Sequence, residues 1–170
     1  IRKIDADNII NTIAGNGEII PYDESGNPLE TSFGSPTAVT LDDSSNYFIA
    51  DAAFNAIRMI HQSSGSIETI AGTIGLEWGS SPDGTPATEA LLGGVKGLTF
   101  DNSTGQLFFS EPWAYKVRYI GLDGNLHTYA GSGEEGNSGE GGDALSASLG
   151  EPNGIDFGPD GSLYFASNIQ

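Results

Sequence analysis

The sequence contains no cysteine and only 6 basic residues against 23 acidic ones, which gives a formal net charge of −17. Without cysteine, the chain has neither disulfides nor thiolate metal sites. So few bases exclude a phosphate-binding surface of the kind that recognises nucleic acids, and they disfavour docking on anionic membranes. No apolar run approaches the roughly 18 residues of a membrane-spanning helix. We therefore expect no nucleic-acid partner and no membrane insertion.

Glycine, by contrast, is abundant, with 25 of the 170 residues. This is about twice the usual share of roughly 7%. Glycine at this level without a collagen-like period indicates many tight turns, and therefore short strands rather than long helices. A chain of this length is sufficient for one ordinary domain.

Four short motifs recur in the same order along the chain. The clearest is Thr-Ile-Ala-Gly at 12–15 and 69–72, which returns as Thr-Tyr-Ala-Gly at 128–131. The others occupy residues 34–42, 93–101 and 150–158; residues 47–51, 107–111 and 163–167; and residues 1–4, 57–60 and 117–120. A repeat of nearly 60 residues, retained three times, predicts a repetitive architecture.

Each repeat contains four strand-like runs, which in the best-defined unit are residues 98–101, 106–111, 116–121 and 126–131. They are rich in β-branched and aromatic residues and are bounded by turn residues such as Asp123-Gly124. Four antiparallel strands per repeat describe a blade of a β-propeller. The predicted fold is therefore all-β, with blade units at about 1–15 (partial), 36–72, 95–131 and 152–170 (partial). Since closed propellers need four to eight blades, we expect these three blades' worth to be part of a larger, six-bladed propeller, completed by further sequence or by a neighbouring copy.

These motifs resemble the NHL-repeat β-propeller family across essentially the whole chain. Residues 36–42, 47–51, 55–60 and 67–72 follow the NHL pattern, and residues 141–149 resemble the linker of long-repeat members. The units diverge in places, because Val95 replaces the usual proline and Glu111 and Ser167 replace the usual aspartate. The resemblance implies a propeller fold and a family that contains ligand binders, scaffolds and a few enzymes.

Nothing in the sequence predicts a catalytic centre. There is no G-x-S-x-G elbow and no H-E-x-x-H motif, and the two histidines, His61 and His127, occupy non-equivalent positions. One NHL-like group of amidating lyases uses histidines and a metal in the central pore. The first strands of the blades here offer only apolar candidates for such a position, and so the resemblance supplies no catalytic residue.

Each complete blade carries an acid and an arginine seven residues apart. Asp51 and Arg58 form one such couple, and Glu111 and Arg118 form the other. A short turn between the second and third strands would bring the two side chains together, and so we expect structural ion pairs that brace the hairpin. We also expect the inward residues of the first three strands of each blade to be mostly buried between blades: Val39, Leu41, Phe48, Ile57, Leu98, Phe100, Phe108, Val117, Ile155, Phe157 and Tyr164.

The long linkers between blades, residues 16–35, 73–94 and 132–152, hold 12 of the 23 acids and none of the bases. In an up-and-down blade, these linkers lie on the same face as the loops between the second and third strands. That face would also carry the aromatic residues Phe54, Trp113, Tyr115, Trp78 and Tyr22. Aromatic side chains beside acids are suited to a protein partner with basic and apolar groups.

Three acids, Glu24, Asp83 and Glu140, fall at one aligned linker position. Either each carboxylate caps backbone amides of its linker, or the position contributes to a divalent cation site such as Ca²⁺. No other cofactor is predicted. The only glycosylation sequon is at Asn102, in an exposed turn.

The sequence therefore favours a non-enzymatic propeller segment that serves protein interaction or assembly in an extracellular or surface protein. A filamentous protein is one such candidate. One alternative is a propeller enzyme of the lyase or hydrolase type whose catalytic residues lie outside this segment. Another is an intracellular NHL scaffold, although such proteins usually present a basic face.

Overall fold

The structure, a computed structural model, describes residues 1–19, 26–73 and 77–168, and it is all-β as predicted. The first two units supply β1 (Arg2–Ile4), β2 (Ile10–Thr12), β3 (Pro36–Leu41), β4 (Tyr47–Asp51), β5 (Ala56–Ile60) and β6 (Ile67–Ala71). The remaining strands are β7 (Leu98–Asp101), β8 (Gln106–Glu111), β9 (Lys116–Ile120), β10 (Leu126–Ala130), β11 (Glu151–Phe157) and β12 (Leu163–Asn168). The helices of the described residues are the short 3-10 turns η1 (Ala87–Glu89), η2 (Pro112–Ala114) and η3 (Ala144–Ser146), none of them long enough to span a membrane.

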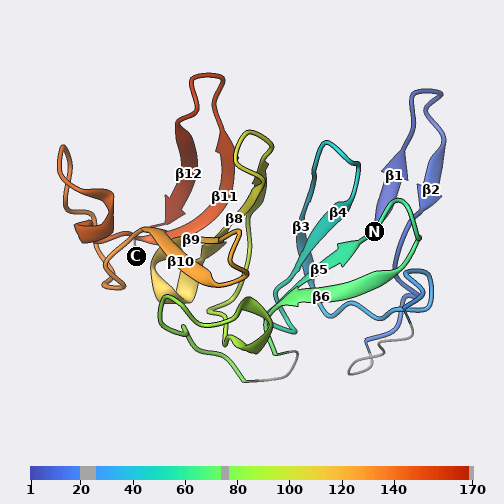
Figure 1. Cartoon of the computed structure of the whole chain (residues 1–170), viewed down its shortest axis with the longest axis horizontal. Helices are drawn as coiled ribbons and strands as arrows, with labels where there is room; N and C mark the ends of the chain where they lie inside the picture. Colours follow the sequence, from blue (N-terminus) through green and yellow to red (C-terminus); the bar gives the residue numbers. More distant parts are fainter. Residues whose placement is uncertain (20–25, 74–76, 169–170) are drawn as a thin grey trace.

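The strands form two complete antiparallel blades, β3-β4-β5-β6 and β7-β8-β9-β10, flanked by the two-stranded sheets β1-β2 and β11-β12 (Figure 1). The predicted bounds of β7 and β8 are confirmed, while β9 and β10 each end one residue earlier than expected. The turns of the β1-β2, β3-β4 and β11-β12 hairpins point to the top of Figure 1, the linkers before β3 and β7 run along the bottom, and the linker before β11 lies at the left. We call that lower side the linker face.

Neighbouring blades pack face to face, and the core lies between them. β7 lies against β3 and β4, and β11 lies against β7 and β8. Phe48 stacks on Phe100 with ring centroids 5.1 Å apart, and Phe108 meets Phe157 edge-on at 5.0 Å. Aromatic contacts of this kind add to the burial of apolar area that stabilises the fold.

The prediction of a buried position is wrong for Val39, Leu41 and Tyr164, whose side chains are 48%, 44% and 61% exposed. Ala38 packs into the core shared with β7, and because side chains alternate along a strand, Val39 and Leu41 point the other way. The β1-β2 sheet on that side has only two strands and leaves them uncovered. Tyr164 likewise lies on the open face of the two-stranded β11-β12 sheet.

The linker between the complete blades also covers the outer edge of the second one. The amide of Ala87 donates to the Gly124 carbonyl at 3.0 Å, and the amide of Leu126 donates to the Thr85 carbonyl at 2.9 Å. These bonds satisfy backbone groups of β10 and of the turn before it, which an uncovered edge strand would leave open to another chain. The linker is therefore part of the blade rather than a loose connection.

Candidate functional site

A buried ion pair joins the second and third strands of the β7-β10 blade, as the sequence predicts. Arg118 Nη1 lies 3.4 Å from Glu111 Oε2, and both side chains are completely buried. Glu111 Oε1 also accepts a hydrogen bond of 2.8 Å from the Gly93 amide. Burial raises the pKa of the Glu111 carboxyl, while Arg118 and the Gly93 amide act in the opposite direction. The pair thus fixes the end of the linker to the hairpin.

Asp83 extends this pair into a clamp on the outer strand. Its Oδ1 accepts from Arg118 Nη2 at 2.9 Å and from the Thr128 hydroxyl at 2.8 Å, while its Oδ2 accepts from the Thr128 amide at 3.0 Å. Partial burial opposes ionisation, but the Thr128 hydrogen bonds and the Arg118 charge hold the pKa of Asp83 below its ordinary value. A guanidinium therefore stands where a bound cation would be needed, which argues against calcium at Asp83.

Of the two residues aligned with Asp83, only Glu140 belongs to the described part of the chain. Glu24 lies outside the described residues, and Glu140 is exposed in its linker. Across the described part of the chain, no three histidine, cysteine or acidic side chains are grouped as metal ligands. The capping interpretation is wrong for Asp83, because its carboxylate accepts from Arg118 and from the Thr128 amide in β10 rather than from amides of its own linker.

We expect Asp83→Asn to destabilise the protein by about 1 kcal/mol, a charged hydrogen bond discounted for a half-exposed side chain. Because the folded pKa of Asp83 is lowered, this contribution is present above the unfolded pKa and is lost as the pH falls through the folded one. Chemical denaturation at pH 7 and at pH 3 measures it. Glu140→Gln, at the aligned but exposed position, is the matched control and should change little. Equal effects from both variants would contradict the clamp.

Asp51 behaves differently from Glu111, although the two are aligned. Its two carboxylate oxygens accept hydrogen bonds of 2.8 Å from the amides of Gly34 and Ser35. None of the ion pairs between described residues joins Asp51 to Arg58, so the pair expected there is not formed. Aspartate is one methylene shorter than glutamate, and both of its oxygens are engaged by the linker backbone.

Two exposed tryptophans come together on the linker face. Trp78 and Trp113 are 65% and 53% exposed, and their ring centroids lie 6.0 Å apart with the planes at 77°. Trp78 belongs to the linker after β6, and Trp113 belongs to η2 between β8 and β9. Exposed tryptophans that meet in this way form a binding surface more readily than a core.

The clamp positions Trp113. Gly93, whose amide is held by Glu111, accepts a hydrogen bond of 3.1 Å from the Trp113 amide. Gly94 lies directly beneath the indole, since a Cβ there would come within 2.9 Å of Trp113 Cδ2 and Cε3. Gly94 also has a positive φ of 74°, which favours glycine. A buried polar network thus places an exposed aromatic ring.

Neighbouring side chains hold the rest of this surface. Asn55 Nδ2 donates to the carbonyl of Glu77, the residue before Trp78, at 3.3 Å. The hydroxyl of Tyr115 donates to Glu135 Oε2 at 3.3 Å. Desolvation raises the pKa of Tyr115, and the nearby carboxylates of Glu135 and Glu151 raise it further. An exposed carboxylate thus lies beside Tyr115, in the same loop as Trp113.

Of the five aromatic residues predicted to bind a partner, Phe54 does not belong to the surface. Phe54 is buried, like Ala114 at the aligned position, and it lies close to Gly34. In both loops the residue two positions after the acid, Ala53 or Trp113, is exposed, and the next residue, Phe54 or Ala114, is buried. Trp78 and Trp113 are exposed, Tyr115 is half-buried, and Tyr22 lies outside the described residues.

Both histidines lie at the opposite end of the blades from the tryptophans. His61 Nε2 is 2.6 Å from Glu68 Oε1, and His127 Nε2 is 3.1 Å from Asp123 Oδ1. Each follows or adjoins the turn between the third and fourth strands of its blade. They are therefore engaged with local acids, in separate blades and away from the linker face.

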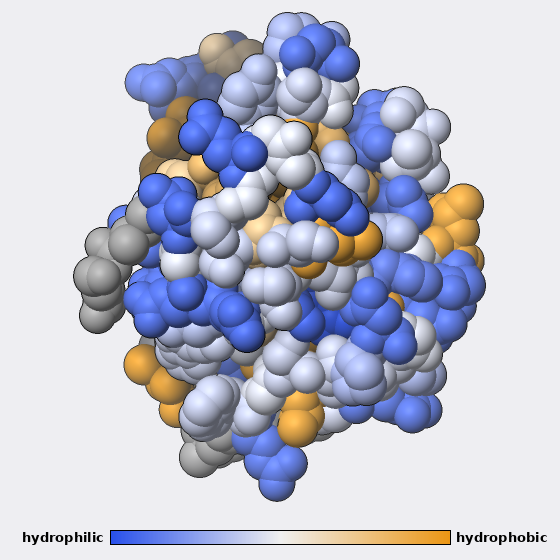
Figure 2. Space-filling model, turned by 90° about the vertical axis from the view of Figure 1, so that its left-hand side faces the viewer, coloured by the Kyte–Doolittle hydropathy of each residue, from blue (hydrophilic) through white to orange (hydrophobic). Residues whose placement is uncertain are grey.

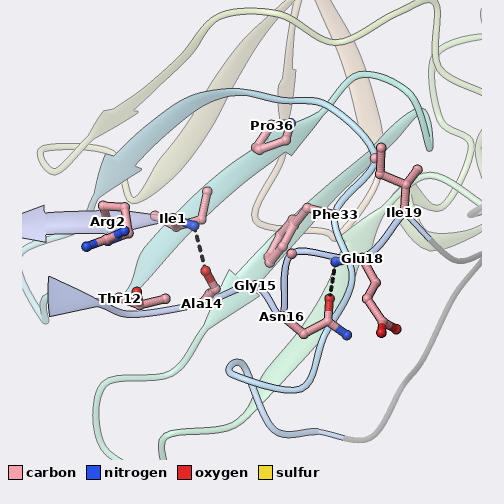
Figure 3. Close-up of a pocket in the computed structure, with 12 residues that line it drawn as sticks. Ile1, Arg2, Thr12, Ala14, Gly15, Asn16, Glu18, Ile19, Phe33 and Pro36 are labelled. Carbon is pink, nitrogen blue, oxygen red and sulfur yellow. Dashed lines mark hydrogen bonds between the residues drawn. The ribbon is translucent and has the colours of Figure 1, made fainter.

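A pocket of about 510 Å³ opens beside β1 and β2 (Figure 3). Phe33 and Ile19 give it an apolar wall, and the Glu18 amide donates to Asn16 Oδ1 at 2.9 Å. Its described lining offers one guanidinium, from Arg2, and one carboxylate, from Glu18. Such a mixed lining gives no set of groups suited to acid–base or metal chemistry, and we place no site here.

The glycosylation candidate Asn102 is exposed in the turn between β7 and β8. Its Oδ1 accepts a hydrogen bond of 2.9 Å from the Asp43 amide in the preceding blade. Its Nδ2, the atom that a glycan would join, makes no hydrogen bond to a described residue. The geometry therefore leaves this position accessible for modification.

The sequence matches no protein-family model, and a search of curated proteins finds no match. Solved structures do match the fold. A protein of unknown function from Bacteroides thetaiotaomicron superposes with a TM-score of 0.72 at 21% identity, over 95% of this chain and 38% of the neighbour. An auxiliary nutrient binding protein from Bacteroides ovatus gives a TM-score of 0.60 at 17% identity, over 81% of this chain and 36% of the neighbour.

Virginiamycin B lyase from Staphylococcus aureus is also similar, with a TM-score of 0.51 at 23% identity, over 78% of this chain and 34% of the lyase. The chain thus spans well under half the length of each of these neighbours. At these identities the likeness establishes the propeller-type fold alone, since unrelated functions share such folds.

Proposed function

We propose that this chain is a non-enzymatic, NHL-like propeller segment that binds a protein partner through its linker face. The observation that carries the proposal is the exposed Trp78–Trp113 pair, in which Trp113 is positioned through the buried Glu111–Gly93 contact. Tryptophan is the residue type most enriched among the side chains that dominate binding energy at protein interfaces. A rigidly supported pair also loses little conformational entropy when a partner binds.

Charge indicates what kind of partner fits. The linkers carry 12 acids and no base, and the face of the molecule seen in Figure 2 is largely hydrophilic with separated apolar patches. A partner that presents basic and apolar groups would be steered toward this face by its field. The same charge disfavours nucleic acid.

We further propose an extracellular or cell-surface location. The accessible sequon at Asn102 and the absence of any thiol are compatible with this location. The auxiliary nutrient binding proteins of Bacteroides among the structural neighbours also support a surface location. The proposal that no reaction is catalysed is supported by the histidines, each of which is paired with an acid far from the tryptophan surface.

Selection of a displayed peptide library on the protein tests the binding proposal. We expect the enriched peptides to be basic and apolar, and we expect Trp78→Ala/Trp113→Ala to weaken their binding by about tenfold or more, as the loss of interface hot spots does. Calorimetry with the synthetic peptides measures the affinity, and circular dichroism checks the fold.

Leu122→Ala is the matched control, because Leu122 is 80% exposed but lies in the turn between β9 and β10, away from the linker face. Peptides that bind the double tryptophan variant as tightly as the wild type would overturn the proposal. So would an equal loss of affinity in the Leu122 variant.

A further inference from the structure

The tryptophan pair has a geometry and a charge environment that select one kind of side chain. Gly94 covers one face of the Trp113 indole, so that a ligand has only the other face of this ring. Trp78 stands at 77° to it, and the two rings therefore form two non-parallel walls. A flat group that stacks on one wall meets the other with its edge.

Acidic residues occur in the segments that carry or adjoin the two rings. Glu77 directly precedes Trp78, and its backbone is held by Asn55. Glu135 is held by the Tyr115 hydroxyl, two residues from Trp113. Both glutamates are exposed, and the side chain of Lys116, three residues after Trp113, lies against Gly133. An aromatic surface with negative charge at its rim attracts a cation through the ring quadrupole and through direct Coulomb interaction.

We propose that the Trp78–Trp113 pair is an arginine-binding site that receives a guanidinium from the partner's chain. This inference rests on the proposed function and names the group recognised at the same surface. A guanidinium is planar, stacks on indole and directs its N–H groups outward in its own plane, toward rim carboxylates such as Glu77 and Glu135. An ammonium group is a strongly hydrated point charge and cannot stack on an indole as a planar guanidinium does.

The experiment exploits the fact that the chain contains only two tryptophans. Their two indole N–H signals, assigned with Trp78→Phe and Trp113→Phe, report binding site by site in NMR titrations. The probes are two blocked pentapeptides that differ at one position, Ac-Gly-Ala-Arg-Leu-Gly-NH₂ and its citrulline counterpart, which has nearly the same shape without the charge. We expect both indole signals to shift with the arginine peptide, and we expect citrulline to weaken the affinity about fivefold.

Charge variants complete the test. Glu77→Gln and Glu135→Gln should each weaken the arginine peptide and leave the citrulline peptide unaffected, and added salt should narrow the difference between the peptides. Glu134→Gln is the matched control, because this exposed neighbour of Glu135 has no side-chain contact with Tyr115. Equal binding of the two peptides, or no shift of either indole, overturns the arginine site. Peptides selected from the library would still depend on the tryptophans in that case, so failure here is distinguishable from failure of the proposed function.

Discussion

Replacing Arg118 by methionine is expected to destabilise the protein by about 3–5 kcal/mol, the usual effect of breaking a buried pair from one side. The substitution keeps most of the side-chain volume but leaves Glu111 fully buried without its cation. It also removes the hydrogen bonds to the Ser81 carbonyl and to Asp83. With a total stability of about 5–15 kcal/mol for an ordinary domain, a loss of this size would be evident in both thermal and urea denaturation.

The effect should depend on pH in a defined direction. Burial already raises the pKa of Glu111, and loss of Arg118 raises it further. A raised folded pKa means that the folded state retains the proton, so stability is preserved at low pH and lost as the pH rises through that pKa. Urea midpoints of Arg118→Met should therefore fall between pH 5 and pH 8 relative to the wild type.

Two further variants make this result specific. Glu111→Gln/Arg118→Met removes both charges but keeps an acceptor for the Gly93 amide, and we expect it to recover much of the stability lost at pH 8. Arg2→Met is the matched control. Arg2 faces Thr12 in β1-β2 as Arg118 faces Thr128 in β9-β10, but it is exposed. A loss for Arg2→Met as large as that for Arg118→Met would contradict the buried-pair argument, and so would a lack of recovery in the double variant.

The sequence predicts the strands of this fold well because each blade repeats the same local signals. Alternating apolar residues, turn residues and the Thr-Ile-Ala-Gly motif all depend on neighbours within one hairpin, and the periodicity therefore places β7 and β8 at their observed bounds. The pair Glu111–Arg118 was predictable for the same reason, since both residues lie in adjacent strands of one hairpin.

Apart from Val39, Leu41 and Tyr164, which lie beside or in the two-stranded sheets, several errors concern contacts that the linkers make. The linker was expected to lie on one face of the blade, but it also runs along β10, which brings Asp83 to Arg118 and Thr128. No local pattern encodes that path. Asp51 was expected to pair with Arg58 because the spacing matched, but a shorter side chain binds the linker amides instead. Phe54 was assigned to the surface because it lies in a loop between the second and third strands, but it aligns with the buried Ala114 and not with the exposed Trp113.

The glycine that ends the Thr-Tyr-Ala-Gly motif is expected to be among the least replaceable residues of the chain. Gly131 has a φ of 99°, and a Cβ there would lie 2.2 Å from the Tyr115 carbonyl oxygen. Gly72 ends the motif in the preceding blade, and a Cβ added there would likewise lie 2.2 Å from the Asn55 carbonyl oxygen. Each glycine thus lets the end of the fourth strand approach the loop between the second and third strands, which in the β7-β10 blade carries Trp113.

We therefore expect Gly131→Ala to destabilise the protein by on the order of 4 kcal/mol, in the range where a specific steric cause is required. Part of that loss, about 1–3 kcal/mol, comes from forcing an alanine to a positive φ. The remainder comes from backbone that must move away from the new Cβ. Because Tyr115 and Trp113 share this loop, the Trp113 indole signal should shift as well. Urea denaturation and NMR measure the two effects.

Gly124→Ala separates the two contributions. Gly124 has a similar positive φ of 77° but no atom within 4 Å of an added Cβ, so only the conformational strain applies there. The difference between the two variants is therefore the free energy of the close approach itself. Gly15→Ala tests the same argument in the first copy of the motif along the chain. Gly15 also has a φ of 99°, but the nearest atom to an added Cβ, in Phe33, would lie at an ordinary 3.5 Å. We expect Gly15→Ala to lose about as much stability as Gly124→Ala. A Gly131→Ala variant that is no less stable than these two would show that the close approach between the end of β10 and the loop is not needed.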